Sequence, residues 1–120
     1  MGIKNVFPVK VVPGRVIING LEIYVSMNNS PPDSNFVSIR PEEIVPLGQN
    51  ASNYKNRLNG RVVKLTCHGF YYNVIIDVKG VFWEATWSRK DIFEHAIEPG
   101  KEITIGIRPQ AIHMFKEKAK

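Results

Sequence analysis

Two stretches of the chain share one pattern, Val37-Ser38-Ile39-Arg40-Pro41-Glu42-Glu43-Ile44 and Ile105-Gly106-Ile107-Arg108-Pro109-Gln110-Ala111-Ile112. In each, a mainly β-branched run leads into Arg-Pro. Proline has no N–H and fixes φ near about −65°, so it ends a strand ladder and can open a helical turn. Each copy predicts a strand, an Arg-Pro corner and one helical turn. The repetition predicts a small β fold with two related halves.

Turn residues elsewhere in the chain predict many short strands. Asn19-Gly20 supplies the positive φ angles of a two-residue hairpin between apolar, β-branched runs. The stretches 28–35 and 46–56 are rich in polar and small residues and are expected to be loops. The expected strands are 6–12, 16–18, 21–25, 36–40, 61–66, 70–78, 81–87, 102–107 and 113–115.

The best helix candidate begins after Ser88. Serine is a good N-cap, and the carboxylate of Asp91 at the third position suits the positive end of a helix dipole. We expect Pro99-Gly100 to end this helix. Many short strands with one helix between the last two long strands are typical of a small barrel. We therefore predict an all-β, OB-fold-like barrel with one short helix, as a single domain over residues 1–120.

Composition indicates an ordinary globular chain with a modest basic excess. Of 120 residues, 43% are hydrophobic and 22% charged, and the formal net charge is +5. This length fits one core, and no apolar run approaches the roughly 20 residues needed to span a bilayer. The single cysteine, Cys67, excludes an internal disulfide. The positive charge suits an anionic ligand, an acidic partner or nucleic acid.

No arrangement of residues indicates catalysis. The chain lacks the Gly-x-x-x-x-Gly-Lys-Ser/Thr pattern of a phosphate-binding loop. His68, His95 and His113 lack the spacing of a helical metal-binding pair. The neighbouring side chains of Glu42-Glu43 would diverge on a short turn, which suits acid–base catalysis poorly. We expect no enzyme activity, no metal and no cofactor for this chain by itself.

Anion binding is the chemistry that the remaining polar residues suggest. A tetrahedral oxyanion needs several convergent N–H and O–H groups, and a loop beside a helix N-terminus can provide them. Basic and polar residues gather at 52–61 and at 88–90. Structural roles compete with ligand binding, because Ser88 suits a helix cap, Asn56 could hold its loop and Arg108 could anchor its turn.

The aromatic residues suggest an alternative. Trp83 and Trp87, with Tyr71 and Phe82, could form a platform on which nucleic-acid bases stack. On a strand, Trp83, Ala85 and Trp87 share one face, which is also typical of a core or a partner interface. An OB-type nucleic-acid-binding domain is therefore kept as an alternative function.

Four segments together resemble the transport-associated oligosaccharide/oligonucleotide-binding (TOBE) domain. They are 38–44, 56–62, 98–101 and 107–113. Residues 2–7 also resemble the junction that follows the nucleotide-binding domain in ATP-binding subunits of ABC importers. The resemblance covers nearly the whole chain, and the order and spacing of the segments are more specific than any one of them. It implies a regulatory domain at the C-terminus of a longer ATP-binding subunit, whose ATPase activity lies outside this chain.

Within that family the chain is most similar to molybdate/tungstate importers and molbindin-like modules. In these proteins a Ser-Ala-Arg-Asn-x-Leu-x-Gly, a Thr-Lys/Arg-Glu-Ser and a Lys-Ala-Ser-Ser segment surround the oxyanion. The corresponding segments here are 53–60, 88–91 and 108–111, in which Asn53, Asp91, Gln110 and Ala111 replace serines. The oxyanion ligands that the resemblance implies are Asn53, Lys55, Asn56, Ser88, Arg89 and Arg108.

The resemblance also implies partners and a location. We expect a homodimer through this domain, contacts with the ABC nucleotide-binding domain and the membrane permease, an oxyanion ligand and no nucleic acid. The location would be cytoplasmic, at the inner face of the cell membrane as part of a transporter. The specific expectation is regulation by internal molybdate or tungstate, and a ligand-free structural dimerisation module is the other alternative.

Overall fold

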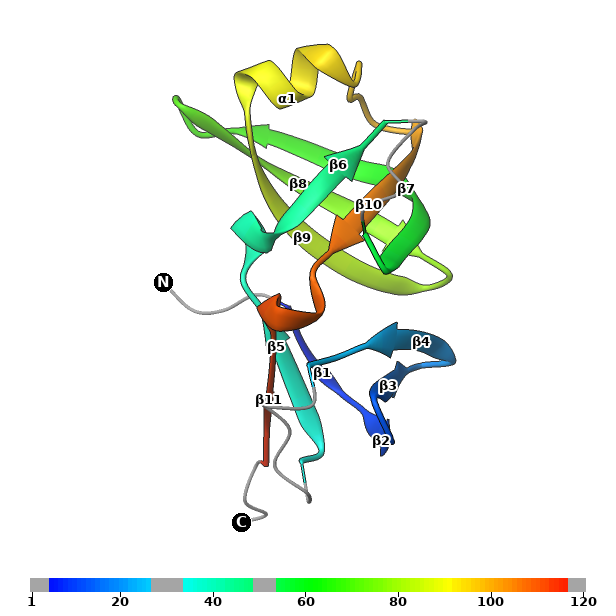
Figure 1. The fold of residues 1–120 in the computed structure, drawn as a ribbon. Coiled ribbons are helices and arrows are strands. Elements are labelled where there is room, and N and C mark those ends of the chain that lie inside the picture. The colour runs from blue at the N-terminus through cyan, green and yellow to red at the C-terminus, as the bar shows by residue number, and fades with distance from the viewer. Residues whose placement is uncertain (1–4, 27–33, 49–53, 117–120) are drawn as a thin grey trace.

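Short antiparallel strands dominate the computed structural model, which describes residues 5–26, 34–48 and 54–116 (Figure 1). The five-stranded sheet has the order β6 (Ile44–Leu47), β10 (Glu102–Ile107), β7 (Asn56–Cys67), β8 (Tyr71–Val78) and β9 (Val81–Ser88). One three-stranded sheet contains β1 (Asn5–Pro8), β5 (Phe36–Ile39) and β11 (Ile112–Phe115). The other contains β2 (Lys10–Val12), β3 (Arg15–Ile18) and β4 (Leu21–Tyr24).

The five-stranded sheet curls into a half-barrel, and the helix α1 (Arg89–Glu94) covers one end of it (Figure 1). The predicted all-β, OB-like fold with one short helix is confirmed. The long strand β7 bends, so that its first half pairs with β10 and its second half with β8. Gly60 lies before this bend, where an added Cβ would come within 2.8 Å of the Asp77 carbonyl oxygen. Only glycine leaves room for the two strands to approach so closely.

The two Arg-Pro corners carry the chain between the half-barrel and the sheet formed by β1, β5 and β11. After β5 the chain passes through Arg40 and the turn η2 (Pro41–Glu43) into β6, which pairs with β10. After β10 it passes through Arg108 and the turn η3 (Pro109–Ala111) into β11, which pairs with β5. The backbones at Arg40 (φ −67°, ψ 139°) and Arg108 (φ −72°, ψ 141°) are nearly the same. The predicted strand, corner and helical turn is confirmed in both copies.

Two buried asparagines make matching contacts across the molecule. Asn5 in β1 lies opposite Ile39, and its side-chain oxygen accepts the Glu84 N–H (2.7 Å) while its amide donates to the Glu84 carbonyl (2.8 Å). Asn56 in β7 lies opposite Ile107 and makes the same pair of bonds with the backbone of Tyr24, at 2.7 and 2.8 Å.

The hairpin turns before Tyr24 and Glu84 also match. Asn19-Gly20 has φ angles of 48° and 89°, and Lys79-Gly80 has 51° and 89°. Tyr24 and Glu84 each lie the same number of residues after the glycine of their turn. Residues 5–47 and 56–115 therefore form quasi-equivalent halves, and each half contributes one strand, β6 or β11, to the other.

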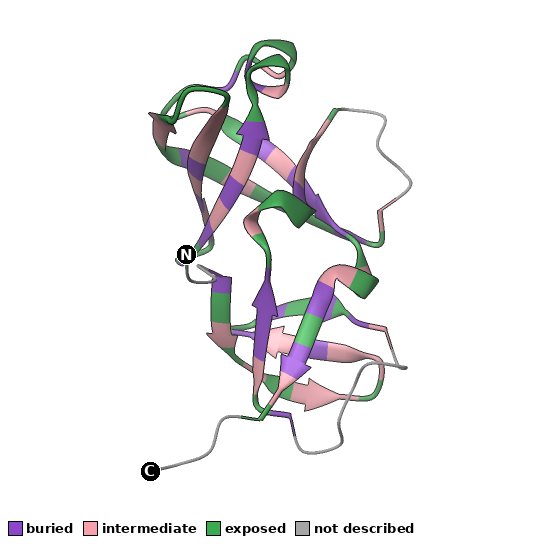
Figure 2. Ribbon diagram, turned by 90° about the vertical axis from the view of Figure 1, so that its left-hand side faces the viewer, coloured by how far each residue is buried: buried purple, intermediate pink, exposed green. Residues whose placement is uncertain are grey.

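The core is continuous through both halves, as the alternating burial along the strands shows (Figure 2). In β9, Trp83 and Ala85 are 0% exposed and Trp87 is 2% exposed, so the shared face predicted from sequence belongs to the core. The Trp83 ring packs against Phe7 of β1, with ring centroids 4.7 Å apart. The base-stacking platform is therefore wrong, since neither indole is open to solvent.

The two edges of the half-barrel approach each other at Trp87. Its indole Nε1–H donates a buried hydrogen bond of 2.7 Å to the Ile44 carbonyl oxygen, which links β9 to β6. The indole N–H of Trp83 has no hydrogen-bond partner within the described residues. The two tryptophans thus fill the same core, but only Trp87 also ties two strands together.

Three local predictions need correction. The stretch predicted as one strand over 6–12 breaks at Val9, whose N–H donates to Asn35 O at 3.0 Å, and so gives β1 and β2. The loop predicted over 46–56 is strand at both ends, because Pro46 lies in edge strand β6 and β7 begins at Asn56 rather than at 61. Proline is tolerated on an edge strand, where its missing N–H removes no ladder bond. Residues 49–53 and most of the predicted loop 28–35 lie outside the described residues.

The helix ends at Glu94 rather than at Pro99-Gly100. Ala96 has the left-handed φ of 49°, and the Ile97 N–H donates to the Ile92 carbonyl oxygen at 2.9 Å. This bond and that from the Ala96 N–H to the Phe93 carbonyl oxygen (3.2 Å) form a Schellman cap, with alanine in the position where glycine is usual. The predicted start is confirmed, because Ser88 and Asp91 make a capping box.

We expect Trp87→Phe to destabilise the protein more than Trp83→Phe. Both changes leave a cavity in the core, but Trp87→Phe also leaves the buried Ile44 carbonyl without its donor, at a cost of about 1–3 kcal/mol. Urea denaturation followed by the fluorescence of the remaining tryptophan measures the difference in the free energy of unfolding. Equal losses in the two variants would show that the Trp87 bond does not hold the barrel edges together.

Candidate anion-binding site

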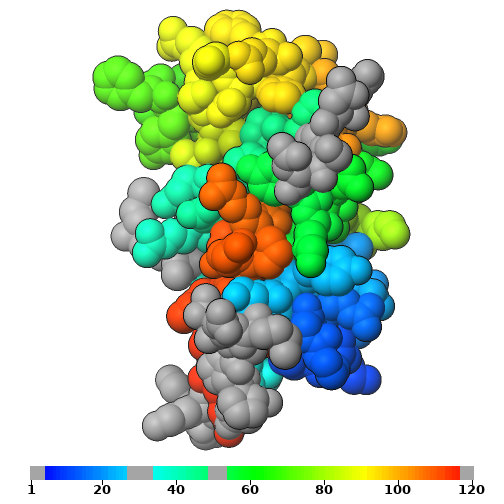
Figure 3. Space-filling model, viewed as in Figure 1, coloured from blue at the N-terminus to red at the C-terminus, as the bar shows by residue number. Residues whose placement is uncertain are grey.

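A hollow of about 690 Å³ lies where the Arg108 corner, the start of β7 and the end of β4 meet. These three segments come together on one face of the molecule, coloured orange, green and light blue in Figure 3. The residues that line the hollow are Pro13, Gly14, Arg15, Tyr24, Val25, Ser26, Tyr54, Lys55, Arg108, Pro109 and Gln110. We call it the Arg108 pocket.

The charge of the Arg108 pocket is one-sided. Among the described residues, its lining contains three basic residues, Arg15, Lys55 and Arg108, and no aspartate or glutamate. Arg15 is engaged outside the pocket lining, in an ion pair of 2.9 Å with Glu22. The ammonium group of Lys55 lies 5.7 Å from the centroid of the Tyr24 ring, within the range of a cation–π contact. An anion that enters the pocket would meet positive charge from strand β3, from the residue before β7 and from an Arg-Pro corner.

The packing of the residues on both sides of Lys55 fixes where its backbone lies in the structure. Before it, the Tyr54 ring lies on the backbone of Gly106, where an added Cβ would be 2.9 Å from Tyr54 Cγ. After it, the Asn56 side chain binds the backbone of Tyr24. Lys55 is exposed between these two anchors, and Arg108 follows the strand that carries Gly106. The two cations are thus positioned by the same strand pair, β7 and β10.

The structure brings together some of the residues predicted as oxyanion ligands and separates others. Lys55 and Arg108 line the Arg108 pocket, and Asn56 lies next to Lys55 with its amide engaged by β4. Ser88 caps α1 and Arg89 begins it, and neither lines this pocket. Asn53 lies outside the described residues.

Sequence reasoning missed the wall of the pocket that comes from the first half. Arg15, Tyr24 and Ser26 belong to the hairpin around Asn19-Gly20 and its end. The hairpin itself was predicted, but no motif placed it beside the Arg108 corner. The repeated Arg-Pro phrase was the signal, because it implied two halves that meet.

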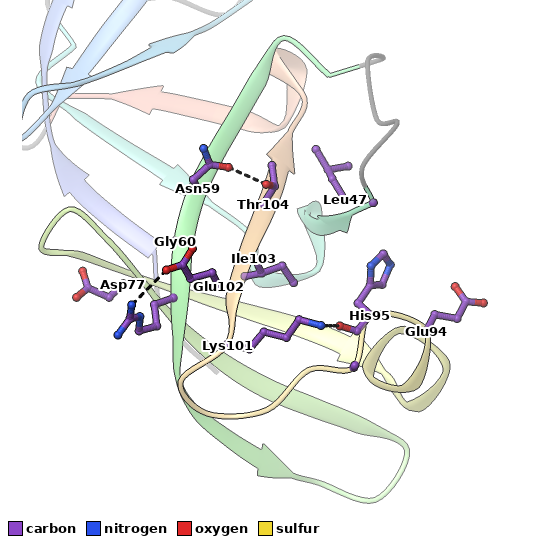
Figure 4. A pocket seen from close by; sticks show the side chains of 13 residues that line it. Leu47, Asn59, Gly60, Asp77, Glu94, His95, Lys101, Glu102, Ile103 and Thr104 are labelled. Atoms are coloured by element: carbon purple, nitrogen blue, oxygen red, sulfur yellow. Dashed lines mark hydrogen bonds and ion pairs between the residues drawn. The ribbon is translucent and has the colours of Figure 1, made fainter.

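A second hollow, of about 720 Å³, lies between β6, β7, β10 and the end of α1 (Figure 4). Polar side chains in its lining are already hydrogen-bonded: Thr104 donates to the Asn59 side chain (2.7 Å), and Lys101 donates to the backbone carbonyl oxygen of His95 (2.6 Å). Its lining has three carboxylates against two fixed cations, which suits an anion poorly. None of the predicted oxyanion ligands that the structure describes lines it. The chemistry therefore favours the Arg108 pocket.

Two further findings narrow what the described residues can do. They contain no group of three or more His, Cys, Asp or Glu side chains that could hold a metal ion. None of their helices is long and apolar enough to cross a membrane.

A family model for the TOBE domain matches residues 37–115. The chain therefore belongs to the TOBE domain family, and the resemblance stated from sequence is confirmed at that level. No curated protein matches the chain.

The fold is shared with a solved structure of ModG, a cytoplasmic molybdate-binding protein, in a form with molybdate bound. The TM-score is 0.75 at 12% sequence identity, over 98% of this chain and 99% of that chain. An apo structure of MopII from Clostridium pasteurianum matches 48% of this chain and 88% of its own, with a TM-score of 0.46 and 22% identity. The ModG likeness shows that the same arrangement of strands covers both whole chains.

Asn56→Ala and Asn5→Ala should destabilise the protein by similar amounts. Each removes an amide that satisfies one backbone N–H and one C=O of a strand in the other half, which we expect to cost about 1–3 kcal/mol. Asn59→Ala, on the exposed face of β7, is the control and should cost about 0.5 kcal/mol or less. Thermal and urea denaturation measure the three variants. A small effect of either buried asparagine would contradict the equivalence of the two contacts.

Proposed function

We propose that this TOBE domain binds a tetrahedral oxyanion of the molybdate or tungstate type in the Arg108 pocket. The observation that carries the proposal is the convergence of Lys55 and Arg108 on one hollow whose lining, over the described residues, has no carboxylate. The fold shared with the molybdate-binding protein ModG supports the same ligand class.

The side chains of the pocket suit an oxyanion for separate reasons. The planar guanidinium of Arg108 can donate to two oxygens of one anion at once. The ammonium of Lys55 is a compact charge that can approach another oxygen. Ser26 and Gln110 add neutral polar groups to the lining. The described part of the lining contains no carboxylate that a doubly charged anion would have to displace.

The binding would serve regulation rather than catalysis. In this proposal the domain is the C-terminal part of an ABC importer's ATP-binding subunit, pairs with its copy in the ATPase dimer and works at the cytoplasmic face of the membrane beside the permease. A ligand can bias a transporter only if its affinity differs between two states. The Arg108 pocket draws its lining from both quasi-equivalent halves, so a bound oxyanion would be sensitive to their relative position.

The alternatives have less support. The nucleic-acid alternative depended on Trp83 and Trp87, which are buried. A ligand-free dimerisation module would need no pocket, and it would not account for the positive charge of the Arg108 pocket.

Titration calorimetry with molybdate, tungstate and sulfate tests the proposal. We expect Arg108→Gln and Lys55→Gln each to weaken binding roughly 10- to 100-fold, because a hydrogen bond to a charged group contributes about 1.5–3 kcal/mol. Lys64→Gln removes the same charge from an exposed position of β7 outside the pocket lining and should leave the affinity unchanged.

Three results would contradict the proposal. The absence of heat with every oxyanion would leave the ligand-free dimerisation module. A loss with Arg89→Gln but not with Arg108→Gln would move the site to α1. An equal loss with Lys64→Gln would show that overall charge, rather than the pocket, attracts the anion.

A further inference from the structure

The quasi-equivalence of the two halves gives the Arg108 pocket a counterpart at the Arg40 corner. Ile39 and Ile107, which precede the two arginines, lie opposite the matching asparagines Asn5 and Asn56. The backbone geometry of the two corners is nearly the same. The chain therefore contains two places with the same backbone framework for a ligand.

The strand register identifies which residues correspond in the two places. Tyr24 lines the Arg108 pocket and binds Asn56, and its counterpart Glu84 binds Asn5. Arg15 pairs with Tyr24 across β3 and β4, whereas Ile75 pairs with Glu84 across β8 and β9.

The two helical turns differ in the same direction. Gln110 and Ala111 follow Arg108-Pro109, whereas Glu42 and Glu43 follow Arg40-Pro41. The turn η2 packs against β9, the strand that carries Glu84. In place of Arg15 and Tyr24 of the Arg108 pocket, the Arg40 corner has Ile75 and Glu84, and in place of Gln110 it has Glu42.

We infer that the chain binds one oxyanion, at the Arg108 pocket, and that the equivalent Arg40 corner does not bind one. The inference rests on the proposed function and deepens it by setting how many ligands the domain takes. The carboxylates of Glu42 and Glu84 would repel an anion at the Arg40 corner, whereas no carboxylate of the described residues lines the Arg108 pocket. The two halves thus share a framework but differ in chemistry, and ligand binding makes the domain asymmetric.

Calorimetry of the full chain with molybdate tests the inference through stoichiometry. We expect one molybdate per chain, a loss of affinity of at least tenfold in Arg108→Gln, and unchanged affinity and stoichiometry in Arg40→Gln. Two molybdates per chain, or a loss of binding in Arg40→Gln, would overturn the inference while the proposed function stands. No binding of any oxyanion to the unmodified chain would overturn the proposed function and this inference with it.

A double variant tests whether carboxylates prevent oxyanion binding at the Arg40 corner. Glu42→Gln with Glu84→Gln removes two carboxylates without adding a cation, and the backbone bonds of Glu84 to Asn5 do not depend on its side chain. We expect a second, weaker molybdate to bind, and to be lost again when Arg40→Gln is added. If the double variant still binds a single molybdate, electrostatic repulsion is not what prevents binding at the Arg40 corner, and the inference loses its basis. Urea denaturation of each variant confirms that it is folded.

Discussion

Each half of this protein is held to the other by an asparagine side chain that acts as a short piece of strand. The amide of Asn56 accepts one backbone N–H and donates to one backbone C=O of Tyr24, as a neighbouring strand would do. Asn5 does the same for Glu84. These bonds satisfy a backbone N–H and a backbone C=O on each of the edge strands β4 and β9, and they fix how the two halves pack against each other. The curled sheet, the two corners and the pocket between the halves all depend on that packing.

The Arg108 pocket follows directly from this arrangement. Asn56 ties β7 to β4, so the residue before it, Lys55, is brought to the ring of Tyr24. Gly106 lets the Tyr54 ring lie on β10, and the chain then leaves β10 at Arg108. Positive charge gathers there because the framework holds the two chain segments together. The stability of the junction and the chemistry of the pocket therefore share the same residues.

Sequence reasoning succeeded where local rules control the structure. The strand over 102–107, the hairpin at Asn19-Gly20 and the helix start at Ser88 are set by alternation, turn residues and capping, all within a few positions. It failed where a distant contact decides. The start of β7 was missed because its inward residue, Asn56, is polar and is satisfied only by β4 from the other half.

The candidate site was predictable in part for the same reason. Lys55 and Arg108 lie in segments that resemble a family pattern, and the structure places both in one pocket. Ser88 and Arg89 come from the same pattern but lie at α1, where Ser88 is the helix N-cap, and neither lines that pocket. Arg15 and Tyr24 carry no motif and become part of the pocket only through the crossing of the two halves. Since β6 completes one half with a strand from the other, and β11 does the reverse, neither half has a finished sheet alone. The domain is in effect an exchanged pair fused into one polypeptide, and its halves must melt together.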